Sequence, residues 1–327
     1  MMKEIFHNKV SVIGAGNVGA TAAMKIAKMD IVRDIVILDI KDGVAEGKAM
    51  DINQCAATEG FKSNVIGVTN DYSATDNSDV IVITSGMPRK PGMSREQLVG
   101  VNSGIMKDVI ENCHKHSPLA IYVIVSNPMD TMCYMTYRIL RGLGKKDVEK
   151  KVIGMGGLLD SSRFVYFIQE ALRDIGSTAS ASEINAWVVG GHGDTTMIPL
   201  ISEATYRGDF VTSYFSEDKI NEIVDKTMRG GAIVTNLLGT SAWEGAGACI
   251  AKTVAAIITN NVMIAPSSVY CKEYDCFIGV FASIGYNGVR EVYLPEDHVE
   301  FYGDCIDKFK ESLAAVKKVN ESCPFVD

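Results

Sequence analysis

The sequence lacks any apolar run close to the roughly 18–20 residues that a helix needs to cross a bilayer. The N-terminus, with Lys3 and Glu4, has neither the apolar core of a signal peptide nor the Arg/Ser-rich, acid-free pattern of a transit peptide. Cations are scarce, since 32 Lys and Arg stand against 40 Asp and Glu, a net charge of −8. This balance argues against a nucleic-acid surface and does not favour membrane binding. We expect a cytoplasmic chain without nucleic-acid or membrane partners.

Cysteine spacings typical of metal sites or disulfide frameworks are also missing. The eight cysteines are scattered, and the closest pair, Cys271 and Cys276, has no nearby companions. Free thiols in a reducing cytoplasm are therefore the favoured interpretation. Four histidines match no ligand spacing with a carboxylate or cysteine: His7, His114, His116 and His298. No metal site is predicted.

A glycine-rich turn near the N-terminus is the first positive signal. A short apolar strand, Val10–Ile13, leads into Gly14-Ala15-Gly16-Asn17-Val18-Gly19, and a helical run, Ala20–Met29, follows. A second strand, Ile35–Leu38, ends at Asp39, twenty positions after the last glycine (39 − 19). A G-x-G-x-x-G turn between a strand and a helix, followed by an acidic residue at this distance, indicates dinucleotide binding.

Each residue of this turn has a predicted task. Gly14 allows the tight turn, Gly16 lets the backbone approach a pyrophosphate, and Gly19 lets helix and strand pack closely. The pyrophosphate would lie on the helix N-terminus, and Asp39 would accept hydrogen bonds from the ribose and repel a 2′-phosphate, which selects NAD over NADP. The alternative is a helix-packing glycine cluster without a ligand. The predicted cofactor contacts here are Gly14, Gly16, Asn17, Val18, Gly19 and Asp39.

Three further runs, Val65–Val68, Val80–Thr84 and Ala120–Val125, are short and apolar, as expected of parallel strands buried on both faces. Small or polar residues follow two of them: Thr84-Ser85-Gly86 and Ser126-Asn127-Pro128. Since ligands bind at the carboxyl ends of such strands, these residues should line the cofactor. Asn127 would orient the nicotinamide ribose or a catalytic histidine, although a turn-forming Asn-Pro without a ligand is an equally good interpretation. The remaining predicted cofactor contacts are Thr84, Gly86, Asn102, Val125 and Asn127.

A chain of 327 residues is too long for one compact core of ordinary size. We predict an α/β protein of two closely packed domains. Residues 1–151 would form a Rossmann domain, a doubly wound parallel sheet that binds NAD. Residues 152–327 would form an α+β domain that binds the substrate and supplies the catalytic residues.

One helix and one loop of the second half form the predicted catalytic site. Asp160 and Arg163 stand three apart, so on a helix they share a face. The helix is indicated by an apolar stripe of Phe164, Ile168, Ala171, Leu172 and Ile175. His192, thirty-two positions after Asp160 (192 − 160), lies among glycines just after a strand-like run, Ile184–Val189. A carboxylate that holds an imidazole, beside a guanidinium, suits proton transfer on an acidic substrate.

A basic loop lies next to the predicted cofactor site. The stretch Met87–Arg95 holds two prolines and a glycine around three cations, Arg89, Lys90 and Arg95. A solvated basic loop is the ordinary interpretation. Its position favours a loop that closes over bound ligand, brings arginines in and excludes water.

Together these motifs resemble the L-malate/L-lactate dehydrogenase family, in its LDH-like malate dehydrogenase branch, over essentially the whole chain. The matching segments are the glycine turn at 14–19, Asp39, the basic loop at 89–95, Ser126–Asp130, Leu159–Phe164 and Gly190–Asp194. Each motif is moderately specific, and their order makes the set highly specific.

The resemblance implies NAD as cofactor and a role for each residue. His192 takes the proton from the C2 hydroxyl of the substrate as hydride leaves C2, and Asp160 fixes its tautomer. Arg163 binds the C1 carboxylate, and Arg95 polarises the C2 carbonyl. Arg89 accepts the second carboxylate of malate or oxaloacetate, where lactate dehydrogenases commonly have glutamine. The predicted substrate contacts are therefore Arg89, Arg95, Arg163 and Asn127.

Three alternatives stay open at this point. A lactate or other 2-hydroxy-acid dehydrogenase is disfavoured by Arg89. An NAD-dependent, metal-requiring glycosidase would need a cysteine or histidine metal site, and His192 has no cysteine beside it. A non-enzymatic NAD-binding protein would not need the catalytic residues.

One segment departs from the family pattern. Trp243-Glu244 stands where relatives often have two tyrosines, which puts the pocket shape and the subunit contacts in question. The resemblance also implies a homotetramer or homodimer.

Overall fold

The computed structural model describes residues 8–87 and 95–324, without the side chains of Arg95 and Glu96. Arg89 and Lys90 therefore lie outside the described residues, as does the side chain of Arg95. Within the described part of the chain, no helix is both long and apolar enough to cross a membrane.

The first half alternates short strands with helices and forms a parallel sheet. Its order is β3-β2-β1-β4-β5-β6, and all these pairs are parallel. Successive strands are added on one side of β1 up to β3 and on the other side from β4 onward, as in a doubly wound sheet. This confirms the predicted Rossmann architecture. The elements are β1 (Lys9–Ile13), α1 (Asn17–Met29), β2 (Asp34–Asp39), α2 (Val44–Glu59), β3 (Asn64–Thr69), η1 (Tyr72–Thr75), β4 (Val80–Ile83), α3 (Arg95–His116), β5 (Ile121–Ile124), α4 (Met129–Gly142), α5 (Val148–Lys151) and β6 (Val152–Gly154).

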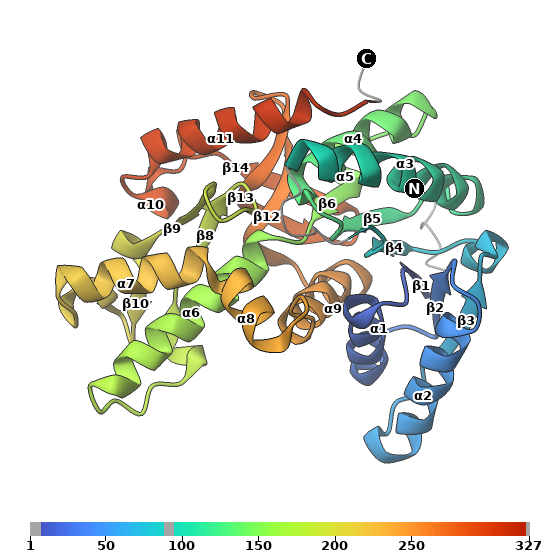
Figure 1. Cartoon of the computed structure of the whole chain (residues 1–327), viewed down its shortest axis with the longest axis horizontal. Coiled ribbons are helices and arrows are strands. Elements are labelled where there is room, and N and C mark those ends of the chain that lie inside the picture. Colours follow the sequence, from blue (N-terminus) through green and yellow to red (C-terminus); the bar gives the residue numbers. More distant parts are fainter. Residues whose placement is uncertain (1–7, 88–94, 325–327) are drawn as a thin grey trace.

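The apolar strands β4 (VIVI) and β5 (IYVI) lie in the middle of the sheet. Every residue of β4 and of β5 is buried, because helices cover both faces of the sheet. α1 and α9 (Glu244–Ile258) lie on one side of the sheet, and α3 and α4 lie on the other (Figure 1). The two faces belong to separate cores, in which Ile26 and Ile250 pack on one side and Met106 and Met132 on the other.

The second half extends the same sheet with antiparallel strands. From β6 the order continues β12-β13-β8-β9, β14 pairs with β13, and β11-β10-β7 form a small separate sheet. The remaining elements are α6 (Gly157–Asp174), η2 (Ala181–Glu183), β7 (Ile184–Asn185), β8 (Val188–Gly190), β9 (Met197–Pro199), η3 (Ile201–Glu203), β10 (Thr205–Tyr206), β11 (Asp209–Phe210), η4 (Val211–Ser213), α7 (Glu217–Met228), α8 (Gly230–Leu238), α9, β12 (Met263–Cys271), β13 (Cys276–Gly285), β14 (Gly288–Tyr293), α10 (Val299–Tyr302) and α11 (Ile306–Asn320).

The two halves are joined through β6 and through a helix pair. β6 runs parallel to β5 on one side and meets β12 at Ser268 and Gly154 on the other. α9 packs on α1 so closely that a Cβ on Gly247 would lie 2.6 Å from Cγ2 of Thr21. The proposed boundary between residues 151 and 152 falls directly before β6 and stays a prediction.

One expected element is interrupted in the structure. The run Ile184–Val189 is divided into β7 and β8, which join different sheets, with Ala186 and Trp187 between them. A second interruption separates α7, which ends at Met228, from α8, which starts at Gly230. Two consecutive glycines at the restart weaken a continuous helix at this point.

One residue of the predicted apolar stripe is misplaced. Phe164, Ile168, Ala171 and Leu172 are buried on α6 as predicted, but Ile175 is 58% exposed. The prediction was wrong for Ile175 because the helix ends at Asp174, so residue 175 no longer follows the helical face.

Candidate active site

The turn between β1 and α1 requires two of its glycines for steric reasons. Gly14 has φ +109°, and a Cβ there would lie 2.8 Å from Oγ1 of Thr84. A Cβ on Gly19 would lie 1.9 Å from the carbonyl oxygen of Gly14. Both positions therefore have the tight turn and close packing that the sequence predicted.

The start of α1 has the properties of an anion site. A Cβ on Gly16 would meet no atom within 4 Å, so the backbone is open at this point. The helix begins at the exposed Asn17 with no side-chain cap and no acidic residue in its first turn. Its first N–H groups and the positive end of its dipole are thus available to a phosphate group, which fits the pyrophosphate of NAD.

Asp39, at the end of β2, accepts a hydrogen bond from the backbone of the glycine turn. One carboxylate oxygen accepts the N–H of Ala15 at 2.7 Å, and the other accepts the N–H of Lys41 at 2.9 Å. A carboxylate has about four lone-pair sites, so capacity remains for ribose hydroxyls. Asp39 therefore fixes the turn and can still receive the ribose.

The ends of β4 and β5 are tied together by Asn102. Its buried amide donates to the carbonyl of Asn127 at 2.7 Å and accepts the N–H of Met87 at 2.8 Å. Thr84 donates to the carbonyls of Ile13 and Gly14, both at 3.1 Å. These side chains hold the loops at the carboxyl ends of β1, β4 and β5, which we call the rim of the site, by hydrogen bonds to backbone groups. Direct contact of Asn102 or Thr84 with a cofactor stays a prediction.

The other predicted cofactor residues lie around the same rim. Gly86 has φ +154°, and a Cβ there would lie 3.4 Å from Nδ2 of Asn102. Asn127 is exposed, and Val18 and Val125 are partly buried. The side chain of Asn127 is thus accessible to a ligand.

The centre of the site is the carboxylate of Asp160, in the first turn of α6. Asp160 is 1% exposed. Its Oδ2 lies 2.7 Å from Nδ1 of His192, and its Oδ1 accepts from Nη1 of Arg163 at 3.0 Å. The predicted shared face of Asp160 and Arg163 is confirmed, and His192 joins them from a loop 32 residues away.

The loop that holds His192 connects β8 and β9 and is fixed from α11. The N–H of Gly191 donates to Oγ of Ser312 at 2.9 Å, and this hydroxyl donates to the carbonyl of Thr196 at 2.6 Å. Sequence reasoning missed Ser312, because nothing local links it to a loop 121 residues earlier.

Gly156, just before α6, lies directly under the histidine. A Cβ there would be 2.9 Å from Cβ and Cγ of His192 and 2.4 Å from Cε of Met129. On the other side of the site, a Cβ on Gly230 would be 3.1 Å from Cδ of Arg163. Glycines thus make room for two of the three central side chains. The repeated glycines at positions 154, 156 and 157 were the available signal.

A second carboxylate, that of Asp130, also contacts the histidine. Its Oδ2 accepts the backbone N–H of His192 at 2.7 Å. Asp130 ends the motif Ser126–Asp130, for which the sequence predicted no role at this position. Its signal was an acid placed directly after Asn127-Pro128-Met129 at a strand end.

The charges around His192 favour its protonated form. Burial, the largest single effect, lowers the pKa of His192, but the charge and hydrogen bond of Asp160 and the charge of Asp130 outweigh it. Arg163 opposes them weakly, and the net result is a raised pKa. The site therefore stabilises an imidazolium, as a proton-transfer residue requires.

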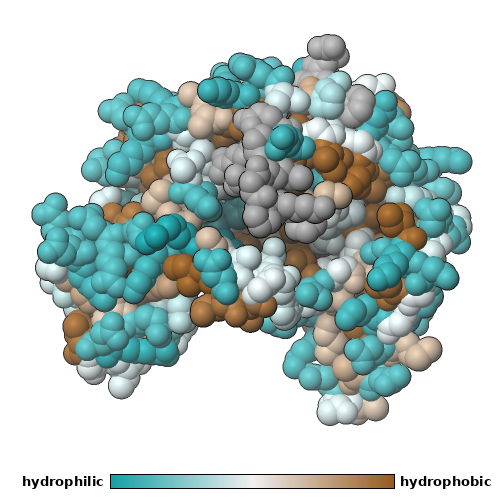
Figure 2. Space-filling model, viewed as in Figure 1, coloured by the Kyte–Doolittle hydropathy of each residue, from teal (hydrophilic) through white to brown (hydrophobic). Residues whose placement is uncertain are grey.

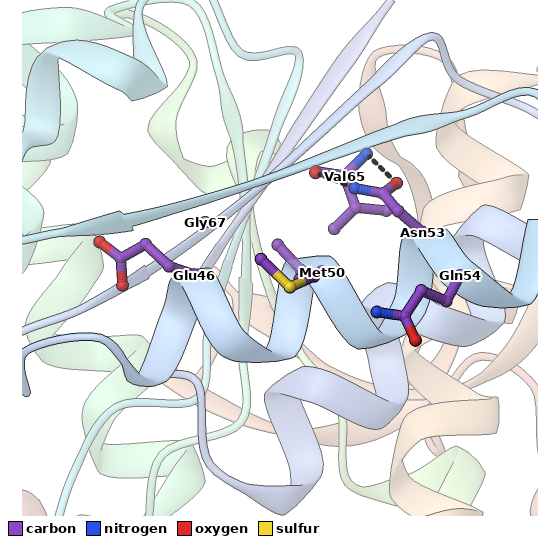
Figure 3. A pocket seen from close by; sticks show the side chains of 7 residues that line it. Glu46, Met50, Asn53, Gln54, Val65 and Gly67 are labelled. Carbon is purple, nitrogen blue, oxygen red and sulfur yellow. Dashed lines mark hydrogen bonds between the residues drawn. The ribbon is translucent and has the colours of Figure 1, made fainter.

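A surface hollow lies elsewhere, between α2 and β3. It has a volume of about 470 Å³ and is lined by Glu46, Ala49, Met50, Asn53, Gln54, Val65 and Gly67 (Figure 3). It contains none of the residues predicted for catalysis or cofactor binding.

Sequence comparison relates both halves of this chain to known dehydrogenases. Residues 8–149 match the family model of the lactate/malate dehydrogenase NAD binding domain, and residues 158–321 match that of the lactate/malate dehydrogenase alpha/beta C-terminal domain. The chain is 51% identical over 317 residues to a malate dehydrogenase from Bacteroides fragilis, a match that covers 96% of this chain and 97% of the relative.

Solved structures show the same fold in two kinds of enzyme. The structure of malate dehydrogenase from Salinibacter ruber has a TM-score of 0.86 and 37% identity, covering 96% of this chain and 97% of the other. The structure of lactate dehydrogenase from Cryptosporidium parvum, complexed with lactic acid and the NAD cofactor, has a TM-score of 0.86 and 30% identity, covering 98% of both chains. By both halves of its sequence and by its fold, this chain belongs to the lactate/malate dehydrogenase family and is an NAD-dependent oxidoreductase.

Proposed function

We propose that the protein is a malate dehydrogenase, which interconverts (S)-malate and oxaloacetate with NAD as the hydride carrier. The observation that supports this proposal most strongly is the arrangement of His192 and Arg163 on the two oxygens of Asp160, at 2.7 and 3.0 Å. A base and a carboxylate clamp are thus held together by one buried group. The relatives named malate dehydrogenase support the same substrate.

His192 is the proposed proton carrier. Bound NAD would accept the hydride from C2 of malate. Because Nδ1 of His192 faces Asp160, the other ring nitrogen, Nε2, is the atom that takes the proton of the C2 hydroxyl. Asp160 keeps the ring in this tautomer and stabilises the imidazolium. In the reverse direction the imidazolium returns its proton to the oxygen of oxaloacetate.

Arg163 is the proposed clamp for the C1 carboxylate. A guanidinium has five N–H donors, and its contact with Asp160 uses one nitrogen, so a fork remains for the substrate. The ion pair with Asp160 restricts the guanidinium before substrate arrives, which reduces the ordering cost of binding.

Substrate choice depends on Arg89 and Arg95 in this proposal. Arg89 pairs with the second carboxylate, and Arg95 polarises the C2 carbonyl. An unpaired charge in a closed site costs about 3–5 kcal/mol, which corresponds to roughly a hundred- to several-thousand-fold discrimination. Pyruvate would leave Arg89 without a partner. The alternative is a lactate or other 2-hydroxy-acid dehydrogenase.

The proposed cofactor contacts follow the rim described above. The glycine turn receives the pyrophosphate, Asp39 the adenosine ribose, and Asn127 the nicotinamide ribose or the substrate. The full set is Gly14, Gly16, Asn17, Val18, Gly19, Asp39, Thr84, Gly86, Asn102, Val125 and Asn127.

The test is NADH oxidation with oxaloacetate and with pyruvate, measured on the wild type and on Arg89→Gln. We expect a strong preference of the wild type for oxaloacetate that collapses in the variant. Arg33→Gln is the control, because Arg33 pairs with Asp34 on the surface. Wild-type preference for pyruvate would reject the proposal and favour the alternative.

The proposed assembly is a homodimer or homotetramer, with the surface of α8 as the contact. On this helix Leu237 is 81% exposed and Leu238 is 52% exposed, and apolar residues gather over α8 (Figure 2). Neighbouring exposed apolar residues of this kind favour an interaction surface. Sedimentation of the wild type and of Leu237→Glu tests this, and a monomeric wild type would reject it.

The proposed compartment is the cytoplasm. All eight cysteines are free thiols, and seven of them are buried. Free thiols are typical of a reducing compartment. Localisation of a tagged chain by fractionation tests this proposal.

A further inference from the structure

Asp130 in the first turn of α4 is a carboxylate that the proposed mechanism does not yet use. It is 6% exposed. Its Oδ2 accepts the backbone N–H of His192 at 2.7 Å, and its Oδ1 accepts the hydroxyl of Ser268 at 2.7 Å. Two donors satisfy the buried carboxylate, and one of them is the main chain of the proposed catalytic residue.

The contact depends on close packing between elements that are distant in sequence. Ser268 on β12 is 138 residues from Asp130. A Cβ on Gly154 would lie 2.2 Å from Sδ of Met129 and 2.7 Å from Cβ of Ser268. The start of α4 is therefore pressed between β6, β12 and the His192 loop. Asp130 fixes the backbone of His192, whereas Asp160 fixes its ring.

Asp130 and Asp160 both act electrostatically on His192. Burial, the largest effect, raises the pKa of Asp130, and the charge of Asp160 adds to it; the bonds from Ser268 and from the His192 N–H, and the charge of His192, oppose this rise, and the net result is a raised pKa. The same negative charge raises the pKa of His192. The other ionisable groups near this pair are Asp160 and Arg163 from α6, Cys133 from α4 and Cys276 from β13.

We propose that Asp130 is a positioning residue for proton transfer, which holds the main chain of His192 in place and adds to Asp160 the charge that stabilises the imidazolium. This inference rests on the proposed role of His192. In this proposal Asp160 orients the ring of His192, and Asp130 anchors its backbone and adds negative charge that favours the imidazolium.

The test is the titration of His192 in Asp130→Asn, followed by NMR of the imidazole. Asparagine keeps an acceptor for the His192 N–H and a donor for the Ser268 oxygen, but it removes the charge. We expect the pKa of His192 to fall by about 0.5 or more, which is about threefold in the protonation constant. The high-pH limit of oxaloacetate reduction should shift in the same direction, with the KM for NADH unchanged.

Two controls separate charge from packing. Ser268→Ala loses a hydrogen bond but keeps the charge of Asp130 and its contact with His192, so His192 should titrate close to the wild type. Thermal unfolding of each variant checks that the fold persists. If Asp130→Asn does not fold, Asp130→Ser, which is smaller and also neutral, takes its place in the titration.

The outcomes also separate this inference from the proposed function. His192→Asn identifies the NMR signal, and turnover in that variant would reject the proposed base, whatever the titration of Asp130→Asn shows. An unchanged titration of His192 in Asp130→Asn would overturn the inference. Loss of turnover with an unchanged titration would overturn it equally, because Asp130 would then be only a structural support.

Discussion

Nδ1 of His192 lies 2.7 Å from Oδ2 of Asp160, while the other oxygen of the same carboxylate holds Arg163 at 3.0 Å. One buried group therefore orients both the proposed base and the proposed carboxylate clamp. A displacement of either partner changes the position of the other. Loss of the Asp160 charge would therefore affect His192 and Arg163 together.

Asp160→Asn tests that charge. Asparagine is nearly isosteric, but it no longer stabilises the imidazolium or pairs ionically with Arg163. We expect kcat with oxaloacetate to fall by about 10²–10⁴-fold, the range for loss of general acid–base catalysis. NADH binding, measured by fluorescence, should be unchanged. Asp174→Asn, at the exposed end of the same helix, is the control, and an equal effect in both variants would refute the assignment.

The raised pKa of His192 predicts opposite pH dependences in the two directions. Oxaloacetate reduction needs the imidazolium, so its rate should fall as pH rises through the raised pKa. Malate oxidation needs the neutral ring, so its rate should fall as pH drops below that pKa. Rates in both directions across pH measure this, and two profiles that fall on the same side would contradict it.

The same shift has a consequence for stability. A group whose pKa is higher in the folded state stabilises the fold below its unfolded pKa, about 6.5 for histidine. The contribution is lost as pH rises through the folded pKa. The free energy of unfolding of the wild type, relative to His192→Asn, should therefore decrease from acidic to alkaline pH. Denaturant titrations at several pH values measure it, and a constant difference would contradict it.

Asp39 is expected to set the preference for NAD by charge. Asp39→Asn keeps an acceptor for the Ala15 N–H but removes the repulsion of a 2′-phosphate. The ratio of NADPH to NADH efficiency should rise by about tenfold, equivalent to about 1.4 kcal/mol. Asp39→Ala should also lose stability by about 1–3 kcal/mol, because the Ala15 N–H loses its acceptor. An unchanged cofactor ratio in both variants would show that another feature sets the preference.

Gly156→Ala tests the space under His192. The new Cβ would lie 2.4 Å from Cε of Met129 and 2.9 Å from Cβ and Cγ of His192. A shift of His192 that relieves this contact would disturb its pairing with Asp160. We expect kcat to fall about tenfold or more, because small misplacements of catalytic groups are costly. Gly104→Ala on α3 is the control, since its Cβ would meet nothing within 4 Å. Full activity of Gly156→Ala would mean that the loop adapts without loss.

The sequence predicted those parts of the site that depend on local patterns. The glycine turn, the short buried strands and the shared face of Asp160 and Arg163 each follow from spacing within a few residues. The pairing of His192 with Asp160 was predicted from their residue types and was also implied by the family resemblance, and the structure places them together.

The parts that the sequence did not predict depend on contacts between distant segments. Ser312 holds the His192 loop across 121 residues, and Ser268 meets Asp130 across 138. Serines are common, and no local pattern marks these two. Likewise, Ala186 and Trp187 divide an apparently continuous strand because its two ends pair with different sheets. Tertiary pairing decided these features.

The most direct test of the account is turnover and NADH binding of His192→Asn, with His116→Asn as the control, since His116, at the end of α3, pairs with Asp76 and with none of the proposed site residues. We predict that His192→Asn binds NADH as the wild type does and loses turnover of malate and oxaloacetate by about 10²-fold or more, while His116→Asn keeps both. Turnover of His192→Asn at the wild-type rate would contradict the account, because the protein would then need another proton carrier.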